Sequence, residues 1–268
     1  MILRMFRHLS GALALAVVTW SPLPGLAQNA ERGLEVMVEQ DRRDAGWKTV
    51  KVAGTMILID KAGRQVSRSF DLVRVERANS GDGDLSRMSF ASPADVKGTV
   101  LLTHGKIEPA DDNQWLFLPA DRRVRRISSA NRSGKFLSSE FSFEDMGGSE
   151  VPDNTYEWLR QEACPGNQGL TCNVVASVPR NPKSGYSQRI VWIDTQEYRP
   201  FQTDFYNRRG KLEKRLTYSG YKNYGGHWRP ARLEMSNLQT GKRTMLEWSD
   251  FRFGVDVGAA VMSPQGLQ

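Results

Sequence analysis

The ionisable side chains indicate what chemistry the chain can perform. Outside the N-terminal segment there are two histidines, His104 and His227, and neither stands in a His-Glu-x-x-His or other paired-ligand spacing. A catalytic zinc is therefore not predicted. Paired carboxylates occur at Asp111-Asp112 and Glu144-Asp145, but neighbouring residues on a strand point to opposite faces, and we expect these pairs in turns or at a helix cap. The residues favour binding over catalysis, with no cofactor and no metal. A Ser/His/Asp set assembled in space is the catalytic alternative.

The two cysteines, Cys164 and Cys172, lie in one polar loop. An even count in an exported chain predicts a disulfide. The ring would be short, so its stabilisation is about 2–3 kcal/mol in the chain-entropy model. A redox site would favour Cys-x-x-Cys spacing, which this pair lacks. We therefore predict a structural disulfide.

Four arginines surround Val124 in a short predicted strand: Arg122, Arg123, Arg125 and Arg126. Alternation places Arg123 and Arg125 on one face and the other two arginines on the opposite face. One interpretation is an edge strand whose charges discourage aggregation. The other is a docking site for lipid phosphates or a partner protein, because guanidinium groups bind such oxygens in a bidentate manner.

The N-terminus has the pattern of a secretory signal peptide. Arg4 and Arg7 precede the apolar run Leu9–Val18, and Gly25-Leu26-Ala27 offers small residues at a cleavage site. Cleavage after Ala27 would leave residues 28–268 as one domain in the periplasm, with no cysteine at the cut to carry a lipid anchor. The net charge falls from +7 to +5 when the two arginines leave. For an exported chain, anionic head groups or an acidic protein face are better partners than nucleic acid.

Periodicity predicts mostly strands. One helix is expected over Ala30–Arg43, where Ala30, Leu34, Met37 and Val38 share a face. A second, short helix is expected from Asp153 or Asn154 to near Glu162. Alternating runs separated by polar or Gly-containing turns predict strands, at Val50–Leu58, Val66–Leu72, Leu85–Ser92, Thr99–His104, Gln114–Leu118, Arg123–Ser128, Cys172–Val178, Ser187–Asp194, Phe201–Tyr206, Lys211–Tyr218, Trp228–Asn237 and Arg243–Phe253. The sum is a mainly β, antiparallel meander, which a curved half-barrel would accommodate.

The stretch Ser92–Met146 contains a hairpin pattern around Trp115-Leu116-Phe117-Leu118-Pro119, the arginine run, and an aromatic segment from Phe136 to Phe143. It resembles the central signature of the outer-membrane lipoprotein-sorting proteins, the LolA/LolB-like superfamily, in the branch found near lipid exporters. Further blocks of the same resemblance follow in order, at Val191-Trp192-Ile193-Asp194, Tyr198-Arg199-Pro200, Phe205–Leu212, Trp228-Arg229-Pro230 and Glu234–Lys242.

The resemblance implies a single curved antiparallel sheet, an open half-barrel whose concave apolar face is covered by helices. It implies a carrier or accessory protein that binds a lipid or lipidated protein and serves an inner-membrane lipid exporter. The basic charge adds peripheral contact with membranes as a separate expectation. An apolar, deformable lining suits acyl chains. Strand alternation gives the candidates for this lining, Met56, Leu58, Phe70, Leu72, Met88, Phe90, Trp115 and Phe117, and a lid segment would contribute Phe136, Leu137, Phe141 and Phe143.

A second function fits the same fold. An interaction subunit would couple an exporter to another envelope protein without carrying lipid, and it would expose an apolar or basic patch. For each cavity candidate taken alone, ordinary core packing is the simpler interpretation. The carrier interpretation depends on the set.

Overall fold

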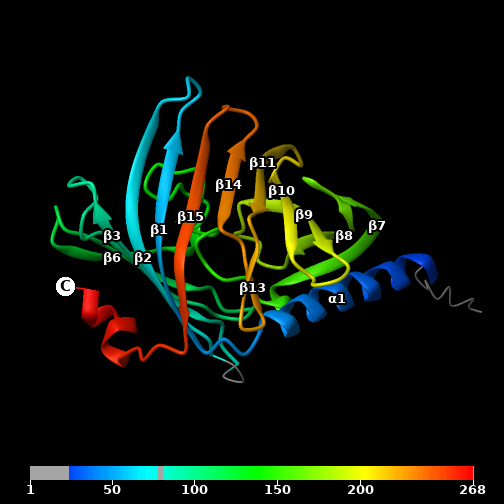
Figure 1. Ribbon diagram of the computed structural model, residues 1–268, viewed down its shortest axis with the longest axis horizontal. Coiled ribbons are helices and arrows are strands. Elements are labelled where there is room, and N and C mark those ends of the chain that lie inside the picture. Colours follow the sequence, from blue (N-terminus) through cyan, green and yellow to red (C-terminus); the bar gives the residue numbers. More distant parts are fainter. Residues whose placement is uncertain (1–23, 78–80, 268) are drawn as a thin grey trace, which may run out of the picture.

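A single antiparallel sheet of thirteen strands dominates the molecule (Figure 1). The computed structural model describes residues 24–77 and 81–267. The charged and apolar parts of the predicted signal peptide lie outside these residues. The strand order is β6-β5-β4-β3-β2-β1-β15-β14-β11-β10-β9-β8-β7, and β12 and β13 form a separate hairpin. All strand pairs among the described residues are antiparallel, so the chain folds largely as a meander.

The elements have the following bounds. The helix α1 spans Pro24–Asp44, and the strands are β1 (Thr49–Ile59), β2 (Gln65–Val75), β3 (Leu85–Ser92), β4 (Val100–His104), β5 (Asn113–Leu118), β6 (Arg123–Ile127), β7 (Asn154–Cys164), β8 (Asn167–Pro179), β9 (Tyr186–Asp194), β10 (Pro200–Asn207), β11 (Leu212–Ser219), β12 (Lys222–Tyr224), β13 (His227–Arg229), β14 (Arg232–Asn237) and β15 (Arg243–Phe253). Short 3₁₀ turns are η1 (Ser129–Asn131), η2 (Val151–Asp153), η3 (Ala259–Met262) and η4 (Pro264–Leu267).

The predicted mainly β class and the curved, open sheet are confirmed. The first predicted helix is present and longer than expected, as α1. Its predicted apolar face is wrong, because Ala30, Leu34 and Val38 are exposed and the buried side carries Gly33 and Val36. The second predicted helix is wrong, because only η2 forms there and residues 154–164 make the edge strand β7. Cross-strand burial prevailed over local helix signals in this segment, since Asn154 and Tyr156 are buried on the sheet.

Strand register gives the sheet two distinct faces. Paired residues share a face, and one continuous row runs through Leu116, Leu101, Met88, Leu72 and Val52 on β5 to β1. The same face continues across β15, β14, β11, β10, β9 and β8 to β7. We call it the concave face.

Two different segments cover the concave face. Helix α1 packs along β7 and β8 (Figure 1), with Val36 against Val175 and Val191. Gly33 allows this close approach, because a Cβ there would lie 2.7 Å from the backbone nitrogen of Trp158. A further part of the face, around Phe90, Phe205 and Leu246, is covered by the connection between β6 and β7, residues 128–150, which we call the covering segment. The helices that we expected over this face are thus one helix and one largely irregular segment.

Candidate functional site

The concave face is lined by apolar side chains from many strands. Phe70 and Phe90 lie with their ring centroids 5.9 Å apart, and Phe70 meets Trp248 edge-on at 5.3 Å. Gly54 leaves room for the Phe70 ring, since a Cβ there would lie 2.5 Å from Phe70 Cζ. Six predicted lining residues belong to this one cluster, namely Met56, Leu58, Phe70, Leu72, Met88 and Phe90. It continues on the later strands through Tyr186, Phe205, Leu216, Met235 and Leu246.

The covering segment fills this lining with its own aromatic residues. Phe136 is fully buried and lies 6.0 Å from Phe90 and 5.6 Å from Phe143 between ring centroids. Phe141 is buried in the same cluster, and Leu137 and Phe143 pack against it. The four residues predicted for a lid therefore lie against the predicted lining. They occupy the position that an apolar ligand on this face would need.

Polar contacts hold the covering segment at its C-terminal part. Lys214 of β11 donates to Asp145 Oδ2 at 2.9 Å, and both side chains are less than a tenth exposed. Tyr186 of β9 donates to the same carboxylate at 2.8 Å. Burial alone would raise the pKa of Asp145, but the Lys214 ammonium and the hydrogen bond from the Ser142 backbone hold that pKa below its usual range. Burial, and next the Asp145 charge, raise the pKa of Tyr186 well above its ordinary value. Asp145 is thus an ionised anchor.

Glu144 forms a second anchor beside the first. Its carboxylate accepts hydrogen bonds from Ser184 Oγ at 2.5 Å, the Gly185 backbone at 2.8 Å and Arg189 at 2.9 Å. Arg132 adds a longer ion pair of 4.0 Å. Because adjacent residues in the turn 143–146 direct both carboxylates to the sheet, Glu144 and Asp145 do more than shape a turn. They tie the segment to β9 and β11.

The middle of the covering segment has its own anchor. Buried Glu140 accepts from Lys135 at 2.6 Å and from the side-chain amide of Asn237 at 2.9 Å. Its backbone nitrogen donates to Thr244 Oγ1 at 2.9 Å. Arg68 of β2 donates to the Leu137 carbonyl at 2.6 Å. The segment is therefore fixed by side-chain contacts and not by a strand ladder, apart from the isolated bridge Lys135↔Ser142 within it.

The anchoring residues on the sheet were not predicted from the sequence. Lys214, Arg189 and Tyr186 sit in ordinary strand patterns, and nothing in their spacing marks them. A buried lysine within a strand is the one unusual feature, but burial is visible only in the fold. Glu144 and Asp145 were noted as a carboxylate pair, without their partners.

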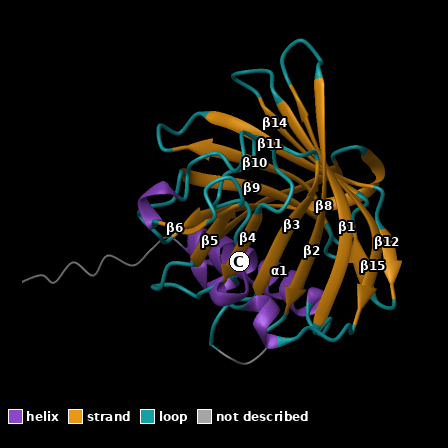
Figure 2. Cartoon of the chain, turned by 90° about the vertical axis from the view of Figure 1, so that its left-hand side faces the viewer, coloured by secondary structure: helices purple, strands orange, loops and turns teal. Residues whose placement is uncertain are grey.

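Trp115 and Phe117 lie on the opposite, convex face. Their register partners Leu102 and Val100 lie there too, and all four cluster with Leu267 near the C-terminus. His104 meets Trp115 edge-on at 4.9 Å and contacts the Met262 carbonyl through Nε2 at 2.7 Å. The C-terminal turns η3 and η4 thus cover the outside of β4 and β5 (Figure 2). These two aromatic residues do not share the space of the other lining candidates.

The arginine run forms the edge strand β6 and its entry turn. Register places Arg123 and Arg125 on the concave side, beside Leu118 and Leu116. Arg125 pairs with Asp121, and Arg126 bonds to the side chain of Asn113. All four arginines, including Arg122 with a positive φ of 49°, are exposed. Their placement is compatible with both interpretations drawn from the sequence.

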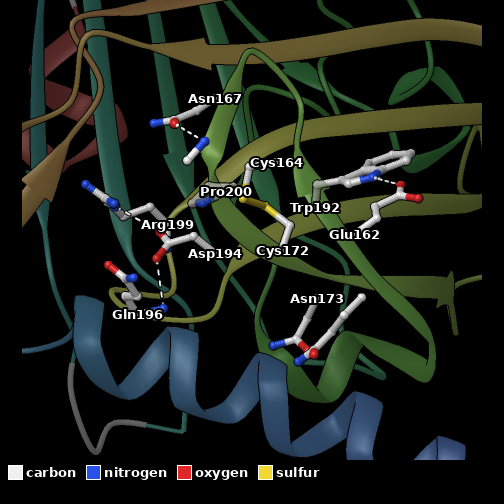
Figure 3. The surroundings of a disulfide bond; sticks show 12 residues. Glu162, Cys164, Asn167, Cys172, Asn173, Trp192, Asp194, Gln196, Arg199 and Pro200 are labelled. Carbon is white, nitrogen blue, oxygen red and sulfur yellow. Dashed lines mark hydrogen bonds and ion pairs between the residues drawn. A yellow bond between two sulfur atoms is a disulfide. The ribbon is translucent and has the colours of Figure 1, made fainter.

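The predicted disulfide between Cys164 and Cys172 is present and buried (Figure 3). It closes the β7–β8 hairpin. Trp192 donates to Glu162 at 2.6 Å on the same side of the hairpin.

The two histidines do not come together: His104 lies on the convex face, and His227 stacks on Phe253 at a centroid distance of 5.4 Å. Within residues 24–77 and 81–267, no group of three or more His, Cys, Asp or Glu side chains is arranged to hold a metal ion.

An open groove of about 650 Å³ lies between the β12–β13 hairpin and the end of β15. Trp248, Phe251 and Tyr224 line it together with Lys222 and Arg252. Trp248 also contacts Phe70, so the groove adjoins the apolar cluster of the concave face.

Among the described helices, none combines the length and the apolar character that crossing a bilayer requires.

Known proteins share this architecture. A family model described as an uncharacterized protein matches residues 82–268. A domain from Vibrio parahaemolyticus, described as an outer membrane lipoprotein-sorting protein domain, is 39% identical and superposes with a TM-score of 0.84 over 89% of this chain and 99% of its own. A DUF1329 family protein from Desulfovibrio piger is 25% identical, with a TM-score of 0.84 over 90% of this chain and 99% of its own.

A LolA superfamily protein from Nitrosomonas europaea shares the fold at 18% identity, with a TM-score of 0.68 over 89% of this chain and 99% of its own. No curated protein matches the sequence. The family model covers more than half of the chain, and the Vibrio domain is similar over nearly its whole length. The chain belongs to the family of outer-membrane lipoprotein-sorting protein domains, and it shares the fold of the LolA superfamily protein.

Proposed function

We propose that the protein is a periplasmic carrier that binds the acyl chains of a lipid or a lipidated protein on the concave face. The observation that carries the proposal is the pairing of this apolar face with a covering segment that lies outside the strand ladder. A lipid would replace Phe136 and Phe141 against Phe90 and its neighbours. Each acyl CH₂ taken from water contributes about 0.8 kcal/mol, which offsets the loss of the segment's own contacts.

The covering segment would act as an internal substitute for the ligand. In the closed state it keeps the aromatic lining out of water, as a soluble carrier without cargo requires. In the closed state its carboxylate anchors are hydrogen-bonded to the sheet. Opening would break these bonds and expose polar as well as apolar groups. A partner that delivers or accepts cargo, such as an inner-membrane exporter, would therefore have to contact this segment. The proposed role is binding and transfer, not catalysis.

Site-specific photo-crosslinking tests the proposal. A photoreactive phenylalanine analogue at Leu137 lies against the concave cluster, and the same analogue at Trp115 lies on the convex face. Both positions are partly buried. Mature protein from its own periplasm is irradiated and examined by mass spectrometry before and after solvent extraction. A lipid adduct at Leu137 and none at Trp115 supports carriage on the concave face. Equal labelling, or no adduct even after incubation with liposomes, contradicts it.

The second candidate function is an interaction subunit that carries no lipid. The observation in its favour is that the concave face is already filled by the covering segment, with Phe136 fully buried. This alternative predicts an empty protein in the same experiment and a stable complex with the exporter.

A further inference from the structure

Three neighbouring hairpin turns gather positive charge at one end of the sheet. The turns at residues 60–66, 207–213 and 238–243 contain seven Lys or Arg side chains, against the carboxylates of Asp60 and Glu213. The basic residues are Lys61, Arg64, Arg208, Arg209, Lys211, Lys242 and Arg243. All seven are exposed. We call this surface the basic crown.

The three turns of the basic crown lie side by side. A Cβ on Gly241 would lie 3.8 Å from the Lys61 Cβ, which places the β14–β15 turn against the β1–β2 turn. The Leu238 backbone nitrogen donates to the Glu213 carbonyl at 2.8 Å, which joins the β10–β11 connection to the same row. Figure 1 shows the tips of these hairpins together at the top of the molecule. The charges therefore form one surface.

Two large apolar side chains project from the same surface. Val66 is 51% exposed and Leu238 is 49% exposed, and they are among the most exposed large apolar residues that the structure describes. Each lies in or beside a turn that carries lysine or arginine. Exposed aliphatic tips flanked by cations match a bilayer interface, where the apolar groups enter the acyl boundary and the cations meet phosphates.

Part of the opposite end of the sheet, at the turns between β2 and β3 and between β4 and β5, is acidic. The described parts of the β2–β3 and β4–β5 connections contain Glu76, Asp82, Asp84, Glu108, Asp111 and Asp112, against two cations, Arg77 and Lys106. An anionic surface would repel this end and attract the basic crown. The charge distribution thus favours one orientation.

We propose that the basic crown is a docking surface for an anionic membrane. The proposal goes beyond cargo binding and does not depend on it, because a protein with an empty concave face would dock equally well. The crown is also connected to the covering segment. Asn237, at the base of the β14–β15 turn, accepts from the Gln239 and Thr240 backbones and donates to buried Glu140. Docking therefore brings the side of the sheet that holds Glu140, the central anchor of that segment, toward the membrane.

Vesicle cosedimentation tests the docking surface. The crown variant combines Lys61→Gln, Arg209→Gln, Lys211→Gln and Lys242→Gln, four side chains that make no ion pair among the described residues. A second variant with the same loss of charge, Arg122→Gln/Arg123→Gln/Arg125→Gln/Arg126→Gln, tests β6 and its entry turn, the other candidate site for lipid phosphates; we call it the β6 control. Both are compared with wild type on phosphatidylcholine vesicles with and without a quarter of phosphatidylglycerol, at low and high salt.

We expect the crown variant to lose about tenfold or more of its affinity for anionic vesicles at low salt, because each surface cation contributes to the attraction. The β6 control should lose less than about threefold. A third variant, Val66→Ser/Leu238→Ser, should keep the salt-sensitive attraction and lose the binding that remains at high salt. All variants should unfold at the wild-type temperature.

Two results would overturn the proposal. One is wild-type protein that binds anionic and neutral vesicles with the same affinity. This result would overturn the proposal even if the crown bound an acidic polypeptide such as polyglutamate. The other is an equal or larger loss of affinity in the β6 control, which would assign the attraction to net charge or to β6 and not to the crown. The carrier proposal is tested separately, since its readout is a lipid adduct at Leu137.

Discussion

The Lys214 ammonium lies 2.9 Å from the Asp145 carboxylate, and the two side chains are 7% and 4% exposed. One belongs to strand β11 and the other to the covering segment, so this ion pair spans the boundary between the sheet and the part that would have to move. Tyr186 and the Ser142 backbone complete the hydrogen bonds of the carboxylate. While the covering segment is closed, every charged group of this buried pair has its partners. Removal of one partner alone would leave the other charge buried and unpaired, which is strongly destabilising.

Lys214→Met should therefore be strongly destabilising. It leaves Asp145 buried without its cation, at a cost of about 3–5 kcal/mol in the free energy of unfolding. Lys214→Met/Asp145→Leu should recover part of the loss, because no unpaired charge remains. Urea denaturation of the single and double variants measures both effects. The control is Arg160→Met, whose pair with Glu162 is largely exposed and should contribute about 0–1 kcal/mol. Equal costs at Lys214 and Arg160 would contradict the anchor.

The raised pKa of Glu150 predicts how the free energy of unfolding depends on pH. Burial, and next the charge of Asp84, raise the pKa of Glu150 to about 7 in the folded protein. Between its ordinary value of about 4.3 and this value, the folded state binds more protons than the unfolded state, so the free energy of unfolding falls as the pH rises through that window. Glu150→Gln keeps an acceptor without the charge. The free energy of unfolding of this variant should exceed that of wild type by about 1–2 kcal/mol at pH 8 and by little at pH 4, after allowance for the partial exposure of Glu150.

Denaturation at both pH values checks this expectation. Asp112 titrates in an overlapping range, since burial raises its pKa to about 6, and Asp112→Asn therefore serves as a comparison within the same acidic end. A Glu150→Gln variant with the same advantage at both pH values would show that the gain does not arise from protonation.

Phe136→Ala should loosen the covering segment more than the sheet. The ring is fully buried between Phe90 and Phe143, and its removal costs about 3–5 kcal/mol where the site cannot collapse. Local opening limits the global effect to the segment's own contribution. Hydrogen exchange should therefore accelerate in residues 128–150 while β9 and β10 stay protected. Val38→Ala on the exposed side of α1 is the control. Uniform acceleration over the sheet would show that the segment is part of the global folding unit.

The strands were predictable because their signal is local. Alternation and turn residues located β3 and β15 with the bounds that the structure has. It was harder to predict which face of the sheet each side chain occupies. A strand such as β5, with Gln114, Leu116 and Leu118 on one side and Trp115 and Phe117 on the other, has apolar residues on both. Only the C-terminal turns, distant in sequence, explain why both faces are covered.

The covering segment illustrates the same limit. Its aromatic composition marked it as a lid, but the polar groups that hold it come from the β8–β9 connection and from β9, β11, β14 and β15, 40 to 104 residues away along the chain. No periodicity in a sequence reports such pairs. The disulfide was predictable because both of its cysteines lie in one hairpin and the chain has no others.

The C-terminal turns supply the last prediction. Leu267 is 2% exposed against Val100 and Leu102, whereas Val261 in the same turns is 37% exposed. Leu267→Ala should therefore lower the free energy of unfolding by about 2 kcal/mol, at the low end for a buried leucine because the chain end can detach. Val261→Ala should change it by less than about 0.5 kcal/mol. Urea denaturation gives both values, and binding of an apolar dye to the Leu267→Ala variant reports the newly exposed face of β4 and β5. If the two substitutions cost the same and no dye binds, the turns do not cover this face in solution.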